Sequence, residues 1–488
     1  MIRNSRLGVP QAHPALAAPV IDALVCAPED ELLSKARPRP SLHVAPESPD
    51  RPRRREYAKR VAITAVTIGV LGWVTTIVNA QAHELVLLVY WYVGAGVIAA
   101  CLVAFVIGRH YSGNEPADGR VLCIIPAYNE HPEGLKKTVL ALLRQTAPVD
   151  IVVIDDGSQV PVEPFLEHPR VRWIRQENTG KRGAQCTVLK EYAPTDYDFI
   201  LTVDSDSEPY PDACEHLLRA MQNPKIQAAT GMIYIRNHDE SWVSLAADID
   251  IGTSCVMMRA SRSMLGALET TSGALALYRS KLLYDHLDGY EVECGTGDDR
   301  WLALRALRRG QVVAVAEALV ETDMPSTLRG TYRQRLRWSR SWWWMMPYVF
   351  KFLSPRQMIS PIYGVLQLTI TPVMVGYVIW TSVASAGERY ANGVHTLLIY
   401  VGAYVVVRYA LSALYLLGRP NVTRRRKMAL FLFGTPAAIF INIILLVPTR
   451  YVALGKLFDN RWQTRELSPA QLAEARAAGL IASQGTAA

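Results

Sequence analysis

The 488-residue sequence has only seven cysteines, and no two of them form a CxxC pair. Cysteines scattered in this way do not build the framework of a disulfide-rich secreted protein, so we expect reduced, packed thiols. Residues 1–56 lack a sustained hydrophobic period and are rich in proline, alanine and charge. They also lack the apolar core of a signal peptide. We expect them to form a disordered tail.

The sequence has a net charge of +8, but its basic residues do not form the organised basic face that a nucleic-acid-binding protein needs. The basic residues instead lie beside apolar runs, a pattern typical of a membrane surface. Half of all residues are hydrophobic, which is a high proportion for a soluble protein. We therefore expect a lipid bilayer as a partner, and no nucleic acid.

Apolar stretches lie on both sides of a central region of ordinary soluble composition. About twenty apolar residues span a bilayer as a helix, and basic flanks mark the cytoplasmic end of a span. The basic flanks at residues 51–60 and 419–427 predict that the central region lies in the cytosol. The apolar stretches cover residues 61–80, 85–107, 358–384, 394–417 and 428–446.

The last apolar stretch contains Gly434-Thr-Pro436 and is followed by Pro448. A segment broken in this way either crosses the bilayer or re-enters on the same side, and composition leaves both paths open. The chain is expected to divide into a tail (1–56), two transmembrane helices (57–109), a cytosolic domain (110–330), interfacial helices (331–356), C-terminal transmembrane or re-entrant segments (357–457) and a C-terminal tail (458–488).

Three buried strands of the cytosolic domain end in polar or acidic residues. These ends are Pro126-Ala-Tyr128-Asn-Glu130, Asp155-Asp156 and Asp204-Ser205-Asp206. Apolar strands separated by helix-length segments predict a mostly parallel α/β sheet, in which ligands bind beyond the carboxyl ends. The four aspartates at this edge repel one another, so we expect Mg²⁺ or Mn²⁺ among them. Asp204 and Asp206 are the predicted metal ligands, and a diphosphate would supply further oxygens.

Three further motifs each have a functional and a purely structural interpretation. Gly180-Lys181-Arg182-Gly183 suits a phosphate but is also an ordinary basic turn at a helix start. Ser272-Gly273 admits a ligand close to the backbone or forms a tight bend. Asp298 and Asp299 open a helix, where acids often cap free N–H groups. Beside a phosphate site, one of these two acids is a candidate general base.

Residues 332–344 combine arginines with four tryptophans next to an apolar stretch. An aromatic belt at the membrane interface accounts for Trp342 to Trp344. Gln334 and Arg337 are three residues apart in the sequence and so share one face of a helix. The neighbouring Trp338 is placed to stack on a sugar.

In their order along the chain these motifs resemble those of the processive inverting family 2 glycosyltransferases, which are the hyaluronan, chitin and cellulose synthases. The motifs are Asp155-Asp156, Asp204-Ser-Asp206, Gly297-Asp-Asp299-Arg300 and Gln334-X-X-Arg337-Trp338. The chain looks most like hyaluronan synthases and rhizobial chitin-oligosaccharide synthases. Arg461-Trp462-Gln-Thr-Arg465 resembles an element that these enzymes keep at the cytosolic active site. The resemblance implies a GT-A fold, a cytosolic C-terminal tail and therefore a last stretch that re-enters.

The resemblance also implies a role for each motif residue. The nucleotide-sugar site would comprise Pro126, Tyr128, Glu130, Asp155, Asp156, Lys181, Asp204 and Ser205, and the metal site Asp204 and Asp206. Asp299, with Asp298 beside it, would take the proton of the acceptor hydroxyl. The acceptor and the diphosphate would contact Ser272, Gly273, Gln334, Arg337, Trp338, Trp462 and Arg465. Ala274 stands where the family usually has proline, and the tryptophan run after Ser341 is unlike most relatives.

This resemblance predicts a plasma-membrane enzyme that joins UDP-GlcNAc and UDP-glucuronic acid into hyaluronan and exports the growing polysaccharide. A GlcNAc polymer of the chitin type fits the same motifs. Non-processive transfer to a polyprenyl phosphate fits the acids but not Gln334-X-X-Arg337-Trp338. A transport or scaffold protein with an inactive transferase domain is disfavoured, because every acid of the motifs is retained.

Overall fold

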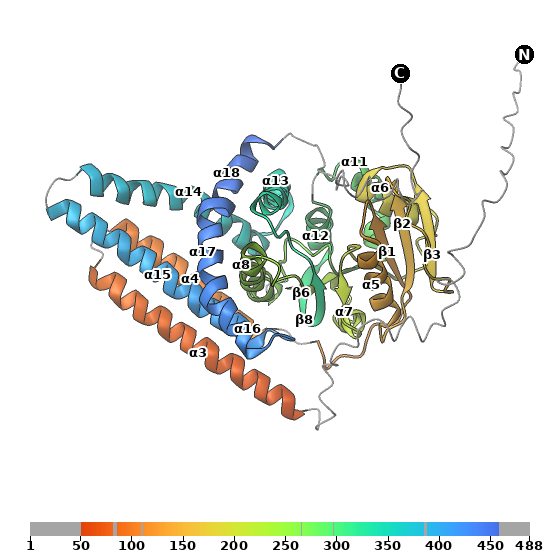
Figure 1. The fold of residues 1–488 in the computed structure, drawn as a ribbon, viewed down its shortest axis with the longest axis horizontal. Coiled ribbons are helices and arrows are strands. Elements are labelled where there is room, and N and C mark those ends of the chain that lie inside the picture. The colour runs from red at the N-terminus through yellow and green to blue at the C-terminus, as the bar shows by residue number, and fades with distance from the viewer. Residues whose placement is uncertain are drawn as a thin grey trace, which may run out of the picture.

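A computed structural model describes residues 50–81, 85–108, 111–264, 266–295, 297–384 and 388–457. Long helices lie side by side at one end of the molecule, and a sheet with shorter helices forms the other end (Figure 1). The helix α13, Leu328–Phe352, lies between these two parts. Residues 1–49 of the expected tail lie outside the described residues. Residues 50–56 belong to helix α3, so the predicted boundary of the tail at residue 56 is wrong.

Within the described residues the sheet has eight strands in the order β3-β2-β1-β4-β7-β6-β8-β5. Strands β3, β2, β1 and β4 are parallel to one another, and β6 is parallel to β8. Strand β7 and the short β5 run antiparallel to their neighbours. The prediction of a mostly parallel α/β sheet is confirmed. The strands are Val121–Ala127 (β1), Asp150–Asp156 (β2), Val171–Gln176 (β3), Phe199–Thr202 (β4), Glu208–Pro209 (β5), Ile226–Ile235 (β6), Ala276–Arg279 (β7) and Gln311–Thr322 (β8).

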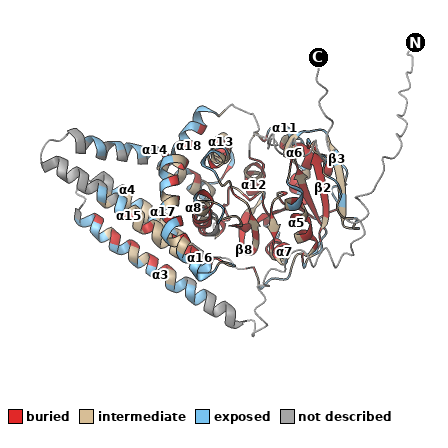
Figure 2. Ribbon diagram, in the orientation of Figure 1, coloured by how far each residue is buried: buried red, intermediate tan, exposed pale blue. Residues whose placement is uncertain are grey.

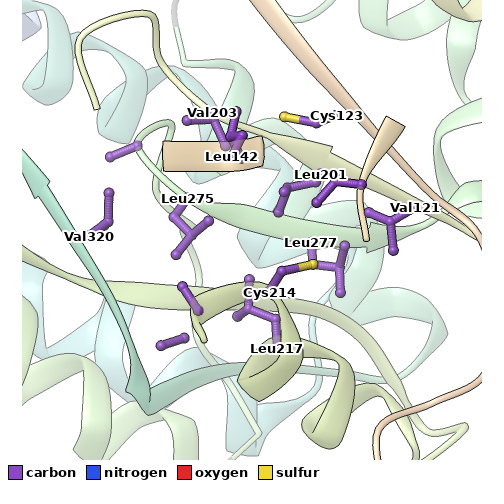
Figure 3. Close-up of a cluster of buried hydrophobic side chains, with 14 of the residues drawn as sticks. Val121, Cys123, Leu142, Leu201, Val203, Cys214, Leu217, Leu275, Leu277 and Val320 are labelled. Atoms are coloured by element: carbon purple, nitrogen blue, oxygen red, sulfur yellow. The ribbon is translucent and has the colours of Figure 1, made fainter. Parts of the chain in front are cut away.

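Helices cover both faces of the sheet, because successive apolar residues of its strands point to opposite sides. Cys123 of β1 packs in the layer with α5 and α7, some of whose side chains are drawn in Figure 3, and Ile124 packs in the layer with α6 and α12. Both layers are buried (Figure 2). The helices of this domain are Pro132–Leu143 (α5), Gly180–Lys190 (α6), Ala213–Met221 (α7), Trp242–Ile251 (α8), Arg259–Met264 (α9), Ser280–Tyr284 (α10), Leu287–Val292 (α11) and Asp298–Arg309 (α12), with a π-helical segment Gly252–Met258 between α8 and α9.

Helices occupy each predicted apolar stretch. They are Asp50–Gln81 (α3), Leu85–Ile107 (α4), Pro355–Ala384 (α14) and Glu388–Gly418 (α15), followed by the last segment. Within the described residues, Tyr57–Ala80, Val401–Gly418 and Arg424–Gly455 are long and apolar enough to cross a membrane. Large apolar side chains such as Val66, Trp380 and Phe433 point outward and are about two-thirds exposed. A bilayer is the solvent that such a surface requires.

The last apolar segment is helical throughout, so the expected break at its prolines is wrong. Helices Arg424–Ala429 (α16), Thr435–Ile441 (α17) and Val447–Gly455 (α18) are joined by π-helical turns at Leu430–Gly434 and Asn442–Leu446. Each π-helical turn ends two residues before a proline, Pro436 or Pro448. The wider turn changes the local hydrogen-bond pattern where proline has no N–H to donate. The side of the membrane on which residues 458–488 lie stays a prediction.

Trp342, Trp343 and Trp344 do not form the expected lipid-facing belt. All three are half-buried and pack against the core layer that contains α12. The Nε1 of Trp343 donates to the backbone carbonyl of Arg450 at 2.8 Å, which joins α13 to α18. The ring of Trp342 lies against Gly364 of α14. The tryptophan run therefore attaches the domain that contains the sheet to the C-terminal helices.

Candidate active site

The turns after β1 and β2 meet at one edge of the sheet, as expected for parallel neighbours. Asn129 has a φ of 49°, a left-handed conformation that asparagine adopts more readily than most residues. Its backbone N–H donates to Oγ of Ser158 at 2.9 Å, and this bond ties the two turns together. The predicted nucleotide-site residues of the first turn are half-buried here: Pro126, Tyr128 and Glu130.

Asp155 is buried at the end of β2 and supports the loop that follows. Its Oδ2 binds Nη1 of Arg175 at 2.9 Å, and its Oδ1 accepts from the backbone N–H of Ser158 at 2.9 Å. Both carboxylate oxygens of Asp155 are thus bonded to groups of the protein itself. The role of Asp155 near the nucleotide stays a prediction.

Asp156 is also buried, but it faces the other side of the sheet. Its Oδ1 accepts from Nε2 of Gln176 at 2.7 Å and from the backbone N–H of Thr179 at 2.9 Å. Thr179 directly precedes helix α6, which carries Lys181 in its first turn. Asp156 therefore fixes the start of the helix that presents this lysine.

Lys181 brings two of the predicted acids together. Its Nζ lies 2.6 Å from Oδ1 of Asp204 and 3.2 Å from Oδ2 of Asp298. Burial would lower the pKa of Lys181, but the charges of Asp204, Asp298 and Asp299 raise it well above its ordinary value. The lysine is therefore a fixed positive charge, where phosphate oxygens can replace a carboxylate as partner.

Gly273 lies directly against this ion-pair cluster. A Cβ at position 273 would come within 2.8 Å of Oδ2 of Asp204 and 3.1 Å of Nζ of Lys181. The turn is held by the backbone N–H of Ser272, which donates to Oγ1 of Thr230 at 3.0 Å. Close approach of backbone to the charged groups therefore requires glycine here. The contact of Ser272 and Gly273 with acceptor or diphosphate stays a prediction.

The first turn of α12 places Asp298 and Asp299 in different environments. Burial would raise the pKa of Asp298, but Lys181 and Arg337 hold it below its ordinary value. Burial and the negative charge of Asp298 raise the pKa of Asp299 to about 6. A carboxylate with a raised pKa next to an ionised acid is suited to accept a proton near neutral pH.

Asp204 and Asp206 offer the oxygen donors that Mg²⁺ and Mn²⁺ take. The Asp204 side chain is 38% exposed, and Oδ1 of Asp206 accepts from Oγ1 of Thr322 at 3.3 Å. Among the described residues, no group of three or more histidine, cysteine or acidic side chains could hold a metal ion. Two carboxylates leave coordination positions for diphosphate oxygens and water, which suits Mg²⁺ or Mn²⁺. Ser205, between the two acids, is buried, and its carbonyl accepts from Oγ1 of Thr138.

Helix α13 carries three of the predicted acceptor and diphosphate contacts, Gln334, Arg337 and Trp338. The charge of Arg337 helps to lower the pKa of Asp298. Trp338 packs against one apolar layer of the sheet, and Nε2 of Gln334 lies 3.5 Å from Sδ of Met324. The remaining predicted contacts, Trp462 and Arg465, lie outside the described residues.

Sequence reasoning missed Thr271, which connects two parts of the site. Its Oγ1 lies 2.6 Å from the hydroxyl oxygen of Tyr278 and donates to the backbone carbonyl of Asp299 at 3.1 Å. The hydroxyl thereby fixes the Ser272-Gly273 turn relative to the first turn of α12. A single threonine far from Asp299 in sequence carries no signal of this contact.

Comparisons with known proteins place the chain's similarity among sugar-transferring enzymes. Residues 117–341 match the family described as "Glycosyltransferase like family 2". The chain is 27% identical over 376 residues to a hyaluronan synthase of Streptococcus pyogenes, covering 73% of this chain and 85% of that enzyme. It is 29% identical over 377 residues to an N-acetylglucosaminyltransferase of Rhizobium meliloti, covering 73% and 84%.

Among solved structures, a mannosyltransferase of Pyrobaculum calidifontis in complex with GDP-Man and Mn²⁺ aligns with a TM-score of 0.48 and 15% identity, covering 83% of this chain and 99% of that one. The matched residues 117–341 contain the Lys181 cluster, the turn at Gly273 and both acids of α12. The chain is therefore a sugar-transferring enzyme, and its residues 117–341 resemble glycosyltransferase family 2.

Proposed function

We propose that the chain is a processive, inverting synthase that polymerises UDP-activated sugars at the cytosolic face and exports the polymer. The observation that carries this proposal is the pairing of Lys181 with both Asp204 and Asp298. Through this pairing the ammonium group of Lys181 joins Asp204, predicted to bind metal and diphosphate, to helix α12, which carries the proposed base Asp299. Helix α13 then leads from this site to the helices that we propose cross the plasma membrane.

In the proposed reaction, Asp299 takes the proton from an acceptor hydroxyl. The hydroxyl oxygen bonds to C1 of the donor sugar as the bond from C1 to the diphosphate oxygen breaks, so UDP leaves with the electron pair. Lys181 and Arg337 supply positive charge where that negative charge develops. A Mg²⁺ or Mn²⁺ bound by Asp204 and Asp206 would add to this stabilisation.

The proposed acceptor is the end of the growing polysaccharide, held by Gln334, Arg337 and Trp338 on α13. Tyr128 and Asp156 would hold the uracil base. The two relatives differ in the activity that their names give, since one is named hyaluronan synthase and the other N-acetylglucosaminyltransferase. We propose hyaluronan from UDP-GlcNAc and UDP-glucuronic acid. A GlcNAc polymer of the chitin type is the second candidate.

The test is UDP release by the purified full-length protein in detergent with Mg²⁺ or Mn²⁺. UDP-GlcNAc, UDP-glucuronic acid and their mixture are offered separately. Sustained release only with the mixture, and a product cleaved by hyaluronidase, is the expected result. Release with UDP-GlcNAc alone and a chitinase-sensitive product would move the chain to the second candidate. A lipid-linked monosaccharide, or no turnover with any donor, would refute the proposal.

The rate should depend on pH through Asp299, which must be deprotonated to act as a base. Because its pKa is raised to about 6, kcat/KM should be constant above about pH 7 and fall roughly tenfold per unit below about pH 6. Initial rates of UDP release between about pH 5 and 8 measure this. A profile that stays flat down to about pH 5 would exclude a base with this pKa.

Replacing Gly273 by alanine should lower kcat/KM by about 100-fold, because a displacement near 1 Å at a reacting centre has an effect of this size. The added Cβ would lie 2.8 Å from Oδ2 of Asp204 and must displace the ion-pair cluster. Gly134→Ala on α5 is the matched control, since a Cβ there meets nothing within 4 Å. Kinetics of Gly273→Ala equal to those of the control would show that the turn lies away from the reacting groups.

A further inference from the structure

Arg236 directly follows β6 and holds the loop that carries the predicted metal ligands. Its Nη2 donates to the backbone carbonyl of Asp206 at 3.2 Å, and its Nη1 pairs with Oε1 of Glu208. The guanidinium therefore binds the loop at Asp206 itself and two residues after it. This fixes the backbone from which the Asp206 carboxylate projects.

The same guanidinium also binds the segment between β8 and α13. Its Nε donates to Oδ1 of Asp323 at 2.9 Å and its Nη2 to Oδ2 at 2.5 Å, a two-point pair. Such fork-like pairs fix orientation as well as distance. The Arg236 side chain is 24% exposed, and that of Glu208 is 14% exposed. The Asp323 side chain is more open, at 40% exposed.

Further contacts lead from Met324, the residue after Asp323, to helix α13, which we call the acceptor helix because it carries the proposed acceptor contacts. Asn237, the next residue after Arg236, donates from Nδ2 to the carbonyl of Met324 at 2.8 Å and accepts at Oδ1 from its N–H at 2.9 Å. The Sδ of Met324 lies 3.5 Å from Nε2 of Gln334 on α13. The Asp206 loop and Gln334 are thus joined through two consecutive residues at the end of β6.

Thr322 adds an independent contact to the same loop. Its Oγ1 donates to Oδ1 of Asp206 at 3.3 Å and accepts from Oγ of Ser207 at 3.2 Å. One carboxylate oxygen of Asp206 is oriented by this hydroxyl, while Arg236 fixes its backbone. Groups that orient metal ligands in this way typically change metal affinity by 10- to 100-fold when they are removed.

We propose that Arg236 is a positioning residue that sets the Asp206 carboxylate for the divalent cation and its diphosphate and keeps this loop in register with Gln334 of the acceptor helix. The inference rests on the proposed function, because it takes Asp204 and Asp206 as the metal-binding pair. Asp323 and Glu208 hold the guanidinium in place. Neither acid needs to touch the cation.

The test is titration calorimetry of Mn²⁺ into the full-length protein in detergent with saturating UDP, which measures binding without turnover. Arg236→Gln should bind Mn²⁺ about tenfold more weakly than the wild type, and Arg236→Lys should lie between the two. Arg219→Gln is the matched control. Arg219 makes comparable bonds, to Glu215 and to the carbonyls of Ser112 and Asn114, in a part of the domain away from the Asp206 loop.

Thermal unfolding of each variant separates positioning from general destabilisation. Weaker Mn²⁺ binding in Arg236→Gln but not in Arg219→Gln, at comparable melting temperatures, supports the inference. Equal Mn²⁺ affinity in Arg236→Gln and the wild type overturns it, as does the same loss in both arginine variants. If Arg236→Gln does not fold, Arg236→Lys takes its place, with a loss of Mn²⁺ affinity of several-fold expected and an unchanged affinity overturning the proposal. A wild-type protein that binds no Mn²⁺ with UDP would refute the metal site of the proposed function, and that result is distinct from a failure of Arg236 alone.

Discussion

Asp299→Asn should lower kcat by about 1,000-fold, within the range that general bases contribute. The amide keeps the shape of the side chain but cannot take the proton of the acceptor hydroxyl. Binding of UDP should change by less than about threefold, because in the structure Lys181 pairs with Asp204 and Asp298 rather than with Asp299. UDP release gives the rate, and calorimetry with UDP gives the binding.

Asp298→Asn is the informative comparison, because its carboxylate sits 3.2 Å from Lys181 and is held ionised by that charge. We expect this variant to change donor binding as well as to slow turnover, because Lys181 loses one of the two carboxylates that hold it in place. Asp285→Asn, on the surface of the same domain, should have neither effect. A kcat for Asp299→Asn within tenfold of the wild type would pass the role of base to another group, and Asp298 would be the first candidate.

The three acidic strand ends could be predicted from the sequence because strand period and burial are local properties. A buried parallel strand needs consecutive apolar residues, and its polar end must emerge at the edge where neighbouring parallel strands also end. This reasoning located Asp156, Asp204 and Asp206 without any knowledge of the fold. It did not reveal that Lys181 bridges Asp204 and Asp298, because those residues come from three segments that only the folded chain brings together.

Other features were misread because one composition fits two environments. A tryptophan run beside an apolar segment suits a lipid interface, but it suits equally well the joint between a domain and its membrane helices. The structure shows the second, with Trp343 bonded to α18 and Trp344 close to Gly295. Proline likewise predicts a broken helix, whereas the π-helical turns before Pro436 and Pro448 keep the helix continuous.

Arg419→Ala should destabilise the protein by about 3–5 kcal/mol, because it leaves Asp248 buried without its cation. Nη2 and Nε of Arg419 both lie 3.3 Å from Oδ1 of Asp248, and the two side chains are at most 2% exposed. Asp248 lies on α8 of the domain that contains the sheet, whereas Arg419 directly follows α15. The expected drop in melting temperature in detergent is roughly 10 °C.

The double variant Asp248→Leu, Arg419→Met separates charge from packing, because it removes both buried charges and keeps similar volume. It should recover most of the stability, since replacing a buried ion pair by apolar groups is often nearly neutral. Arg424→Ala, an exposed arginine at the start of α16, should change the melting temperature by less than about 2 °C. A double variant as unstable as Arg419→Ala would place the loss in packing instead, for example in the close contact of Gly252 with the ring of Tyr415. Recovery would show that the loss in Arg419→Ala comes from the unpaired buried charge of Asp248, and that apolar packing between α8 and the end of α15 can replace the ion pair.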